Sequence, residues 1–128
     1  EKPYANKYTI CDSINGCAFL IDANVYEEQN FMDEGTFLYF EEIILGYQLQ
    51  ERGYSCVLDG FSKINHLQGV STKSSKWNFS FFMEFEKVRS EIYYFRHIVK
   101  SSCLLIPVVK YLRYVEVYIK YLCNLFYK

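Results

Sequence analysis

Several features that mark common protein classes are missing from this chain of 128 residues. The five cysteines are odd in number and include no Cys-x-x-Cys pair, which favours buried free thiols in a reducing compartment over a disulfide framework. No uncharged apolar run reaches the roughly 20 residues that a membrane-spanning helix needs. The formal net charge of −1 gives no overall attraction to nucleic acid, so we expect no nucleic-acid partner. No secretory signal opens the chain, and we expect Glu1-Lys2-Pro3 to lie inside a longer protein.

The composition is rich in apolar and aromatic residues instead. With 51% hydrophobic and 20% aromatic residues, the chain is not a disordered tail. Its length is enough for one modest core. Charge is unevenly spread, because residues 98–128 carry five Lys or Arg residues against a single acidic residue, Glu116. This basic end is a candidate surface for contact with another molecule.

The first half of the sequence predicts short strands that alternate with helices. Residues 13–21 are apolar without a helical period, which predicts a buried strand. Asp22 and Asn24 are candidate N-caps of a short helix that ends near Asn30. The remaining predicted elements are a turn at 31–36, a helix from about 38 to 52 that ends at Gly53, a strand at 54–58 with a turn at Asp59-Gly60, and a short extended segment at 62–67.

The second half predicts two helices with a break between them. Residues 77–99 are rich in Phe, Tyr and Glu and predict the first helix, and Ser101-Ser102 interrupts the pattern. A last helix begins near Leu105, with Pro107 tolerated in its first turn. Its apolar positions are Leu105, Val108, Val109, Leu112, Val115, Ile119, Leu122 and Phe126, and its polar stripe is Lys110, Arg113, Glu116, Lys120 and Asn124. Three interpretations stay open for this helix: packing on another part of the protein, contact with a membrane surface, and self-association.

Two acidic pairs are candidates for chemistry. Asp33-Glu34 lies in the predicted turn, and Glu41-Glu42 lies near the start of the helix that follows. A carboxylate in a partly desolvated cleft can act as a general base. Acids at a helix N-terminus also interact favourably with the helix dipole, which is the structural alternative. Neighbouring helical residues point about 100° apart, so Glu41 and Glu42 cannot perform the same step.

The order of these features resembles a known enzyme family. The run from Phe31 reads Phe-Met-Asp-Glu-Gly-Thr-Phe-Leu-Tyr-Phe-Glu-Glu, the following helix ends in Arg-Gly-Tyr, and His66 precedes Gly-Val-Ser-Thr at 69–72. This is similar to the acceptor half of family 2, GT-A-fold glycosyltransferases. The resemblance implies an α/β fold in which residues 1–75 form the acceptor-binding, C-terminal portion of a nucleotide-diphospho-sugar transferase, with short mixed strands and helices. Residues 76–128 would then be an aromatic-rich tail of amphipathic helices.

The resemblance also implies roles for individual residues. Glu42 matches the second acid of the family's Glu-Asp motif and would be the catalytic base, while Glu41 would orient acceptor hydroxyls. Because Glu stands where the family has Asp, the choice between Glu42 and Glu41 as the base stays open. The implied substrate-binding residues are Gly16, Asp33, Glu34, Ser71 and Thr72.

A divalent metal, Mn²⁺ or Mg²⁺, is the cofactor that the resemblance implies. His66 matches a family histidine that can join the metal beside the nucleotide diphosphate. The carboxylate ligands of that metal come from an Asp-x-Asp motif, which this chain lacks. We therefore expect a preceding half of the protein to hold most of the metal site and the nucleotide.

The implied function is that of a C-terminal fragment of an inverting glycosyltransferase, inactive by itself. The complete enzyme would transfer a sugar from a nucleotide-sugar donor to a glycan or lipid-linked acceptor in bacterial cell-surface polysaccharide synthesis. Its expected location is the cytoplasm, with residues 98–128 a candidate contact with the inner face of the cell membrane. The alternatives are a non-catalytic glycan-binding domain and a membrane-surface interaction domain.

Overall fold

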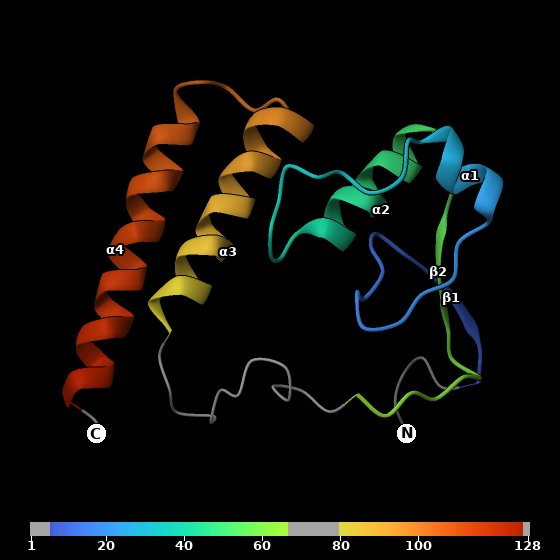
Figure 1. The fold of residues 1–128 in the computed structure, drawn as a ribbon, viewed down its shortest axis with the longest axis horizontal. Helices are drawn as coiled ribbons and strands as arrows, with labels where there is room; N and C mark the ends of the chain where they lie inside the picture. The colour runs from blue at the N-terminus through green and yellow to red at the C-terminus, as the bar shows by residue number, and fades with distance from the viewer. Residues whose placement is uncertain (1–5, 67–79, 127–128) are drawn as a thin grey trace. The chain divides into compact units, whose positions relative to one another are not determined.

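The computed structural model describes residues 6–66 and 80–126, which form two compact units (Figure 1). Within these ranges the first unit comprises residues 6–34 and 41–66, and the second unit comprises residues 35–40 and 80–126. The first unit contains a two-stranded sheet with helices, and the second unit is helical. This mixture of strands and helices is compatible with the predicted α/β class.

The first unit is built from two short strands and two helices. Strand β1 (Tyr8–Cys11) pairs antiparallel with β2 (Cys56–Asp59), which places Cys11 opposite Cys56. Helices α1 (Ala23–Glu28) and α2 (Glu41–Glu51) complete the unit (Figure 1). Its core consists of buried residues and the partly buried side chains packed on them: Leu45, Leu49 and Cys56, with Cys11, Ile14, Phe19, Ile21, Val25 and Met32.

Local sequence signals set the ends of these elements as predicted. The Asp22 side chain accepts hydrogen bonds from two backbone N–H groups in the first turn of α1 and so caps the helix. Asn30 (φ 65°) and Gly53 (φ 83°) adopt the left-handed conformation just beyond α1 and α2. The strand predicted at 54–58 is confirmed as β2, which begins and ends slightly later.

Two predicted extended segments of the first unit are wrong. Residues 13–21 form no strand, because the Asn15 side-chain oxygen accepts a hydrogen bond from the N–H of Cys17 and turns the chain. Most of this segment is exposed rather than buried. Residues 62–66 form no strand either. The only sheet in the part of the chain that the structure describes is therefore the β1–β2 pair.

Helix α2 begins at Glu41, later than the predicted start near residue 38. The backbones of Tyr39 and Phe40 have φ angles of 68° and 72°, which a right-handed helix does not allow. Left-handed backbone is uncommon for aromatic residues and costs roughly 1–2 kcal/mol each. The strained pair fixes the start of α2, so that Glu41 and Glu42 occupy its first turn.

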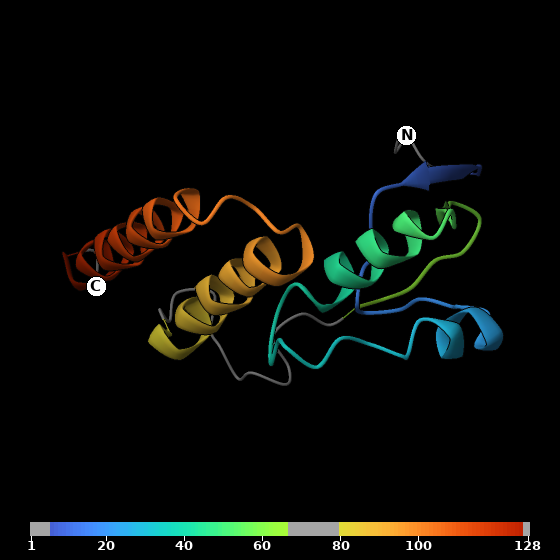
Figure 2. The same ribbon diagram turned by 90° about the horizontal axis from the view of Figure 1, so that it is seen from above.

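The second unit is a helical hairpin. Helix α3 (Phe81–Tyr93) continues into a short π-helix, η1 (Tyr94–Ile98), and α4 (Leu105–Phe126) returns beside α3 (Figures 1 and 2). The predicted break at Ser101-Ser102 and the predicted start of the last helix are both confirmed. Segment 35–40 packs on α3 and η1, where the Ser90 hydroxyl donates a 2.7 Å hydrogen bond to the Leu38 carbonyl.

Helix α4 does not bury its apolar row against α3 and expose its polar stripe, as an amphipathic helix usually would. The polar stripe contributes Arg113 and Lys120 to the interface with α3, where they pair with Glu91 and Glu84 respectively. The α4 residues that are buried, Ile106 and Val117, lie outside the long apolar row recognised in the sequence. That apolar row points away from α3 and is largely exposed. Among the described residues, no helix is long and apolar enough to cross a membrane.

Candidate functional site

One face of α2 packs along the backbone of residues 12–16. Gln50 donates a 2.8 Å hydrogen bond from its Nε2 to the Asp12 carbonyl. One helical turn earlier, Gly46 approaches Asp12 and Ser13, and one further turn earlier Glu42 approaches Gly16. Residues four apart lie on the same helix face, so this single stripe of α2 holds the segment in place.

Gly46 makes this approach possible. A Cβ atom at position 46 would lie 2.8 Å from the Asp12 carbonyl oxygen and 3.0 Å from the Ser13 Cα. The first distance is shorter than real Cβ contacts allow and the second is unusually tight, so glycine lets the helix and the segment lie this close. A glycine in a helix interior normally costs about 1 kcal/mol relative to alanine, and here it permits packing that a side chain would block.

The close packing brings Glu42 to Gly16. A Cβ built on Gly16 would lie 3.5 Å from the Glu42 carboxyl carbon and 3.6 Å and 3.7 Å from its two oxygens. The Glu42 side chain is half-buried, whereas Gly16 is exposed. Within residues 6–66 and 80–126, no hydrogen bond or ion pair holds the Glu42 carboxylate. Two residues to which the resemblance gives a substrate-binding role and a catalytic role, Gly16 and Glu42, therefore lie against each other.

Glu41 occupies a different face of α2 from Glu42. It is half-buried and lies about two helical turns before Gln48, which puts Glu41 and Gln48 on the same face. Gln48 lines a pocket of about 460 Å³. Glu41 and Glu42 therefore have different neighbours. Glu42 faces Gly16, and Glu41 lies on the same helix face as Gln48, which lines the pocket.

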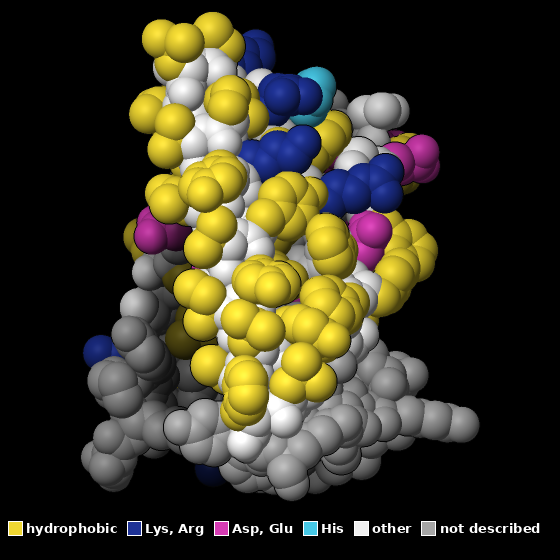
Figure 3. Space-filling model, turned by 90° about the vertical axis from the view of Figure 1, so that its left-hand side faces the viewer, with side chains coloured by type: hydrophobic (Ala, Val, Ile, Leu, Met, Phe, Trp, Pro, Cys, Tyr) yellow, Lys and Arg dark blue, Asp and Glu magenta, His cyan; other side chains and the backbone are white. Residues whose placement is uncertain are grey.

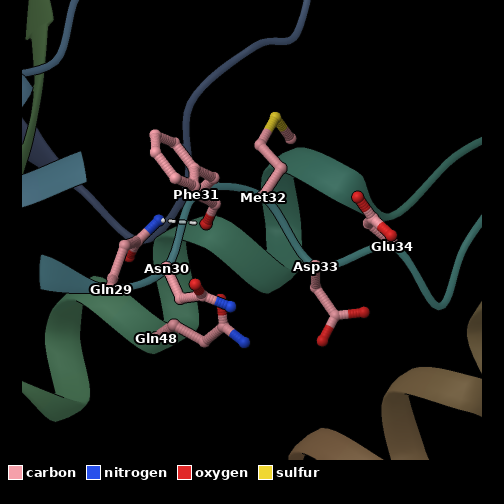
Figure 4. Close-up of a pocket in the computed structure, with 7 residues that line it drawn as sticks. All are labelled: Gln29, Asn30, Phe31, Met32, Asp33, Glu34 and Gln48. Carbon is pink, nitrogen blue, oxygen red and sulfur yellow. Dashed lines mark hydrogen bonds between the residues drawn. The ribbon is translucent and has the colours of Figure 1, made fainter. Parts of the chain in front are cut away.

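The pocket is formed by the chain that leaves α1, together with Gln48 from α2 (Figure 4). Its lining residues are Gln29, Asn30, Phe31, Met32, Asp33, Glu34 and Gln48. Asn30 and Phe31 both have φ angles of 65°, and this pair of left-handed residues turns the chain back on itself. The turn is held by a 3.0 Å hydrogen bond from Gln29 Nε2 to the Phe31 carbonyl and by edge-on contact of the Tyr26 and Phe31 rings.

The polar groups of the pocket suit a ligand rich in hydroxyls. Figure 4 shows the side chains of Asn30, Gln48 and Asp33 pointing to the same side of the pocket and Met32 to the other. The amides can both donate and accept hydrogen bonds, and the carboxylate accepts them. Glu34 also lines the pocket, so both acids of the predicted turn are here. Sequence analysis missed Asn30 and Gln48 as site residues, although the helical spacing of Gln48 from Glu41 is a usable signal.

Among the described residues, His66 does not line this pocket. His66 is exposed. Ser71 and Thr72 lie outside the described residues. No group of three or more His, Cys, Asp or Glu side chains in the described ranges is arranged to hold a metal ion. The described residues alone therefore do not make a metal centre, and the metal-ligand role of His66 stays a prediction.

Comparison with protein-family models, with curated proteins and with solved structures finds no match to this chain. The described geometry offers the half-buried carboxylate of Glu42 with a glycine against it, and a polar pocket lined in part by Gln48 of the same helix.

Proposed function

We propose that the first unit is the acceptor-binding portion of an inverting, GT-A-fold glycosyltransferase of the family 2 type. The observation that carries the proposal is the contact between Glu42 and Gly16. The resemblance in the sequence assigns Glu42 to the base and Gly16 to the surroundings of the donor sugar. In such a reaction the base must lie within a few ångströms of the acceptor hydroxyl that attacks the donor sugar, and the contact between Glu42 and Gly16 supports this assignment.

In the proposed reaction Glu42 accepts the proton of an acceptor hydroxyl. The hydroxyl oxygen forms a bond to the anomeric carbon of the donor while the bond from that carbon to the diphosphate breaks, and the nucleoside diphosphate leaves with the electron pair. Because Gly16 has no side chain, a sugar could approach the backbone closely at this position. Glu42 is preferred over Glu41 as the base because it faces Gly16, whereas Glu41 shares the face of Gln48 at the pocket.

The pocket supplies acceptor binding in this proposal. Asp33, Asn30 and Gln48 offer acceptors and donors for sugar hydroxyls, and Phe31 and Met32 add apolar surface. The acceptor would be a glycan or a lipid-linked glycan, and the nucleotide-sugar donor would be held mainly by another part of the protein. The same pocket also supports a second candidate function, a non-catalytic glycan-binding domain, because its polar lining does not depend on Glu42.

A comparison of matched variants separates the two functions. In a protein that joins this chain to a nucleotide-binding half, Glu42→Gln should lower the rate of transfer by about 100-fold to 10,000-fold, the usual worth of a general base. Glycan binding by the pocket should be retained. Glu51→Gln at the exposed end of α2 is the control and should change neither property.

Direct measurements decide the outcome. Turnover is followed by release of nucleoside diphosphate, and glycan binding by titration calorimetry. Retention of full turnover in Glu42→Gln would exclude Glu42 as the base, and its loss in Glu41→Gln alone would transfer the role to Glu41. If no nucleotide sugar is turned over but Asp33→Asn abolishes glycan binding, the binding-domain alternative holds. The chain of residues 1–128 by itself should show no transfer.

A further inference from the structure

The exposed face of α4 carries an apolar row with the spacing of a helix-pairing surface. We define the apolar seam as Leu105, Val108, Leu112, Val115, Ile119, Leu122 and Phe126. These residues recur at alternating intervals of three and four along the 22 residues of α4. This average period of 3.5 is the one at which two helices keep their apolar rows in contact along their length.

The seam has no cover within the described structure. Relative exposure is 58% for Leu105, 59% for Leu112, 53% for Ile119 and 82% for Phe126. Tyr111 and Tyr118 beside the seam are 70% and 60% exposed. Figure 3 shows hydrophobic side chains gathered along this face of the helical hairpin. An exposed apolar surface of this extent on a folded unit indicates an interaction site.

The charges of α4 point to a protein partner rather than an anionic membrane. An interfacial helix that binds anionic lipid presents cations along the border of its apolar face. Here Arg113 pairs with Glu91 and Glu116, and Lys120 pairs with Glu84 and Glu116, so two of the three cations of the polar stripe are neutralised at the α3 interface. The third, Lys110, lies 6.0 Å from the centroid of the Tyr114 ring. The seam itself contains no charged residue.

We propose that the seam pairs with the seam of a second copy of this chain. Two uncharged rows of the same spacing can meet without bringing like charges together, so the surface is complementary to itself. Because each α4 already packs on its own α3, pairing produces a four-helix arrangement with the two α4 helices at its centre. Crossing angles near 20°, which the 3.5 period favours, are those of four-helix bundles.

The area available is sufficient for a specific dimer. Fully burying a Val, Leu, Ile or Phe side chain removes roughly 60–120 Å² of apolar surface from water. With the exposed fractions of the seam and its flanking tyrosines, pairing along α4 would bury roughly 500 Å² per copy, or about 1,000 Å² in total. That total reaches the smallest interfaces that hold specific complexes together. The proposal does not depend on the proposed glycosyltransferase function, whose residues lie in the first unit.

Sedimentation analysis over a range of concentrations tests the pairing. The chain should be a dimer, and the double variant Leu112→Gln/Ile119→Gln should dissociate at least about 100-fold more readily, since a dimer then loses four buried apolar side chains. The control Leu20→Gln/Ile64→Gln makes the same two changes at exposed positions of the first unit, where relative exposure is 102% and 66%. It should remain a dimer, and circular dichroism should show unchanged helix content in all three proteins.

A cross-linking measurement keeps the test informative if the glutamine variant unfolds. With the exposed Cys17, Cys103 and Cys123 changed to serine, Val115→Cys near the middle of the seam should form an intermolecular disulfide on mild oxidation. Leu20→Cys should not. A chain that stays monomeric at about 100 µM, or a seam variant that dimerises as well as the control, overturns the proposal. So does a monomer whose binding to phosphatidylglycerol vesicles is lost with Leu112 and Ile119.

Discussion

At the residue scale, Gly46 and Gly16 differ in what an added methyl group would meet. At position 46 the methyl would lie 2.8 Å from a backbone oxygen, whereas at position 16 its nearest neighbour is the Glu42 carboxyl carbon at 3.5 Å, an ordinary contact. We expect Gly46→Ala to destabilise the first unit by about 1–3 kcal/mol, although alanine is the better helix former. Gly16→Ala should change the stability by less than about 0.5 kcal/mol.

Denaturant unfolding followed by circular dichroism measures both changes. A stabilised Gly46→Ala variant would contradict the close packing of α2 on residues 12–16, because the helix preference of alanine would then be the larger effect. The Gly46→Ala variant also tests the candidate site around Glu42. If the packing is as described, Gly46→Ala should also weaken any function that depends on Glu42, since the distance between Glu42 and Gly16 is set by the same helix face.

Single residues also decide where sequence analysis succeeds. Asp22, Asn30 and Gly53 act through their own backbone and short side chains, so their positions at helix ends can be predicted without knowledge of the fold. Asn15 acts in the same local way, yet its turn was overlooked because the surrounding residues are apolar. The contact of Glu42 with Gly16 could not be deduced from spacing alone, because it depends on how α2 packs on residues 12–16.

At the scale of elements, an ionic network joins α3 and α4. Glu116 lies between Arg113 and Lys120, which in turn reach Glu91 and Glu84 on α3. The hydrogen bond from Lys120 lowers the pKa of Glu116 below its ordinary value of 4.5, and the charge of Arg113 acts in the same direction. Since the pKa is lower in the folded state, the stabilisation is complete above the unfolded-state value and is lost as the pH falls through the folded-state value.

The same network responds in the opposite sense at high pH. Hydrogen bonds to Glu116 and Glu84 raise the pKa of Lys120 above 10.5, so its contribution is complete below that pH and is lost as the pH rises through the folded-state value. We expect the helical hairpin to lose stability below about pH 4.5 and above about pH 10.5. Glu116→Gln should weaken both dependences. Thermal melts of the helical signal test this, and a variant with the full acid dependence would contradict it. High salt should reduce the effect because these side chains are partly exposed.

The helices illustrate how much of an element a sequence specifies. The period of residues 105–126 predicts α4, and the serine break predicts its start, because an amphipathic pattern and a serine break are local properties. The pattern does not reveal which face is covered. Arg113 and Lys120 face α3 because they form ion pairs with Glu91 and Glu84 on that helix. These pairs join residues far apart in the sequence, and they leave the apolar seam exposed. Similarly, the left-handed Tyr39 and Phe40 delay the start of α2 without any local sequence warning.

At the scale of the whole molecule, the reactivity of the five free thiols can show whether the two units open separately. Cys17, Cys103 and Cys123 are exposed, Cys11 is half-buried, and Cys56 is buried in the core of the first unit. Burial raises the pKa of Cys56, and the nearby Cys11 adds to the shift, so less of the reactive thiolate is present near neutral pH. Alkylation of Cys56 therefore requires the first unit to open.

Timed alkylation with mass-spectrometric readout should accordingly modify the three exposed thiols first, Cys11 later and Cys56 last. Because Cys56 reacts through opening of the first unit, Gly46→Ala should accelerate its alkylation by the same factor by which it raises the open population, about 5-fold to 160-fold for a loss of 1–3 kcal/mol. Glu116→Gln, which affects the ion pairs of the helical hairpin, should leave the Cys56 rate unchanged while that hairpin becomes less stable. If both variants accelerate Cys56 equally, the two units do not open independently and the chain unfolds as one cooperative structure.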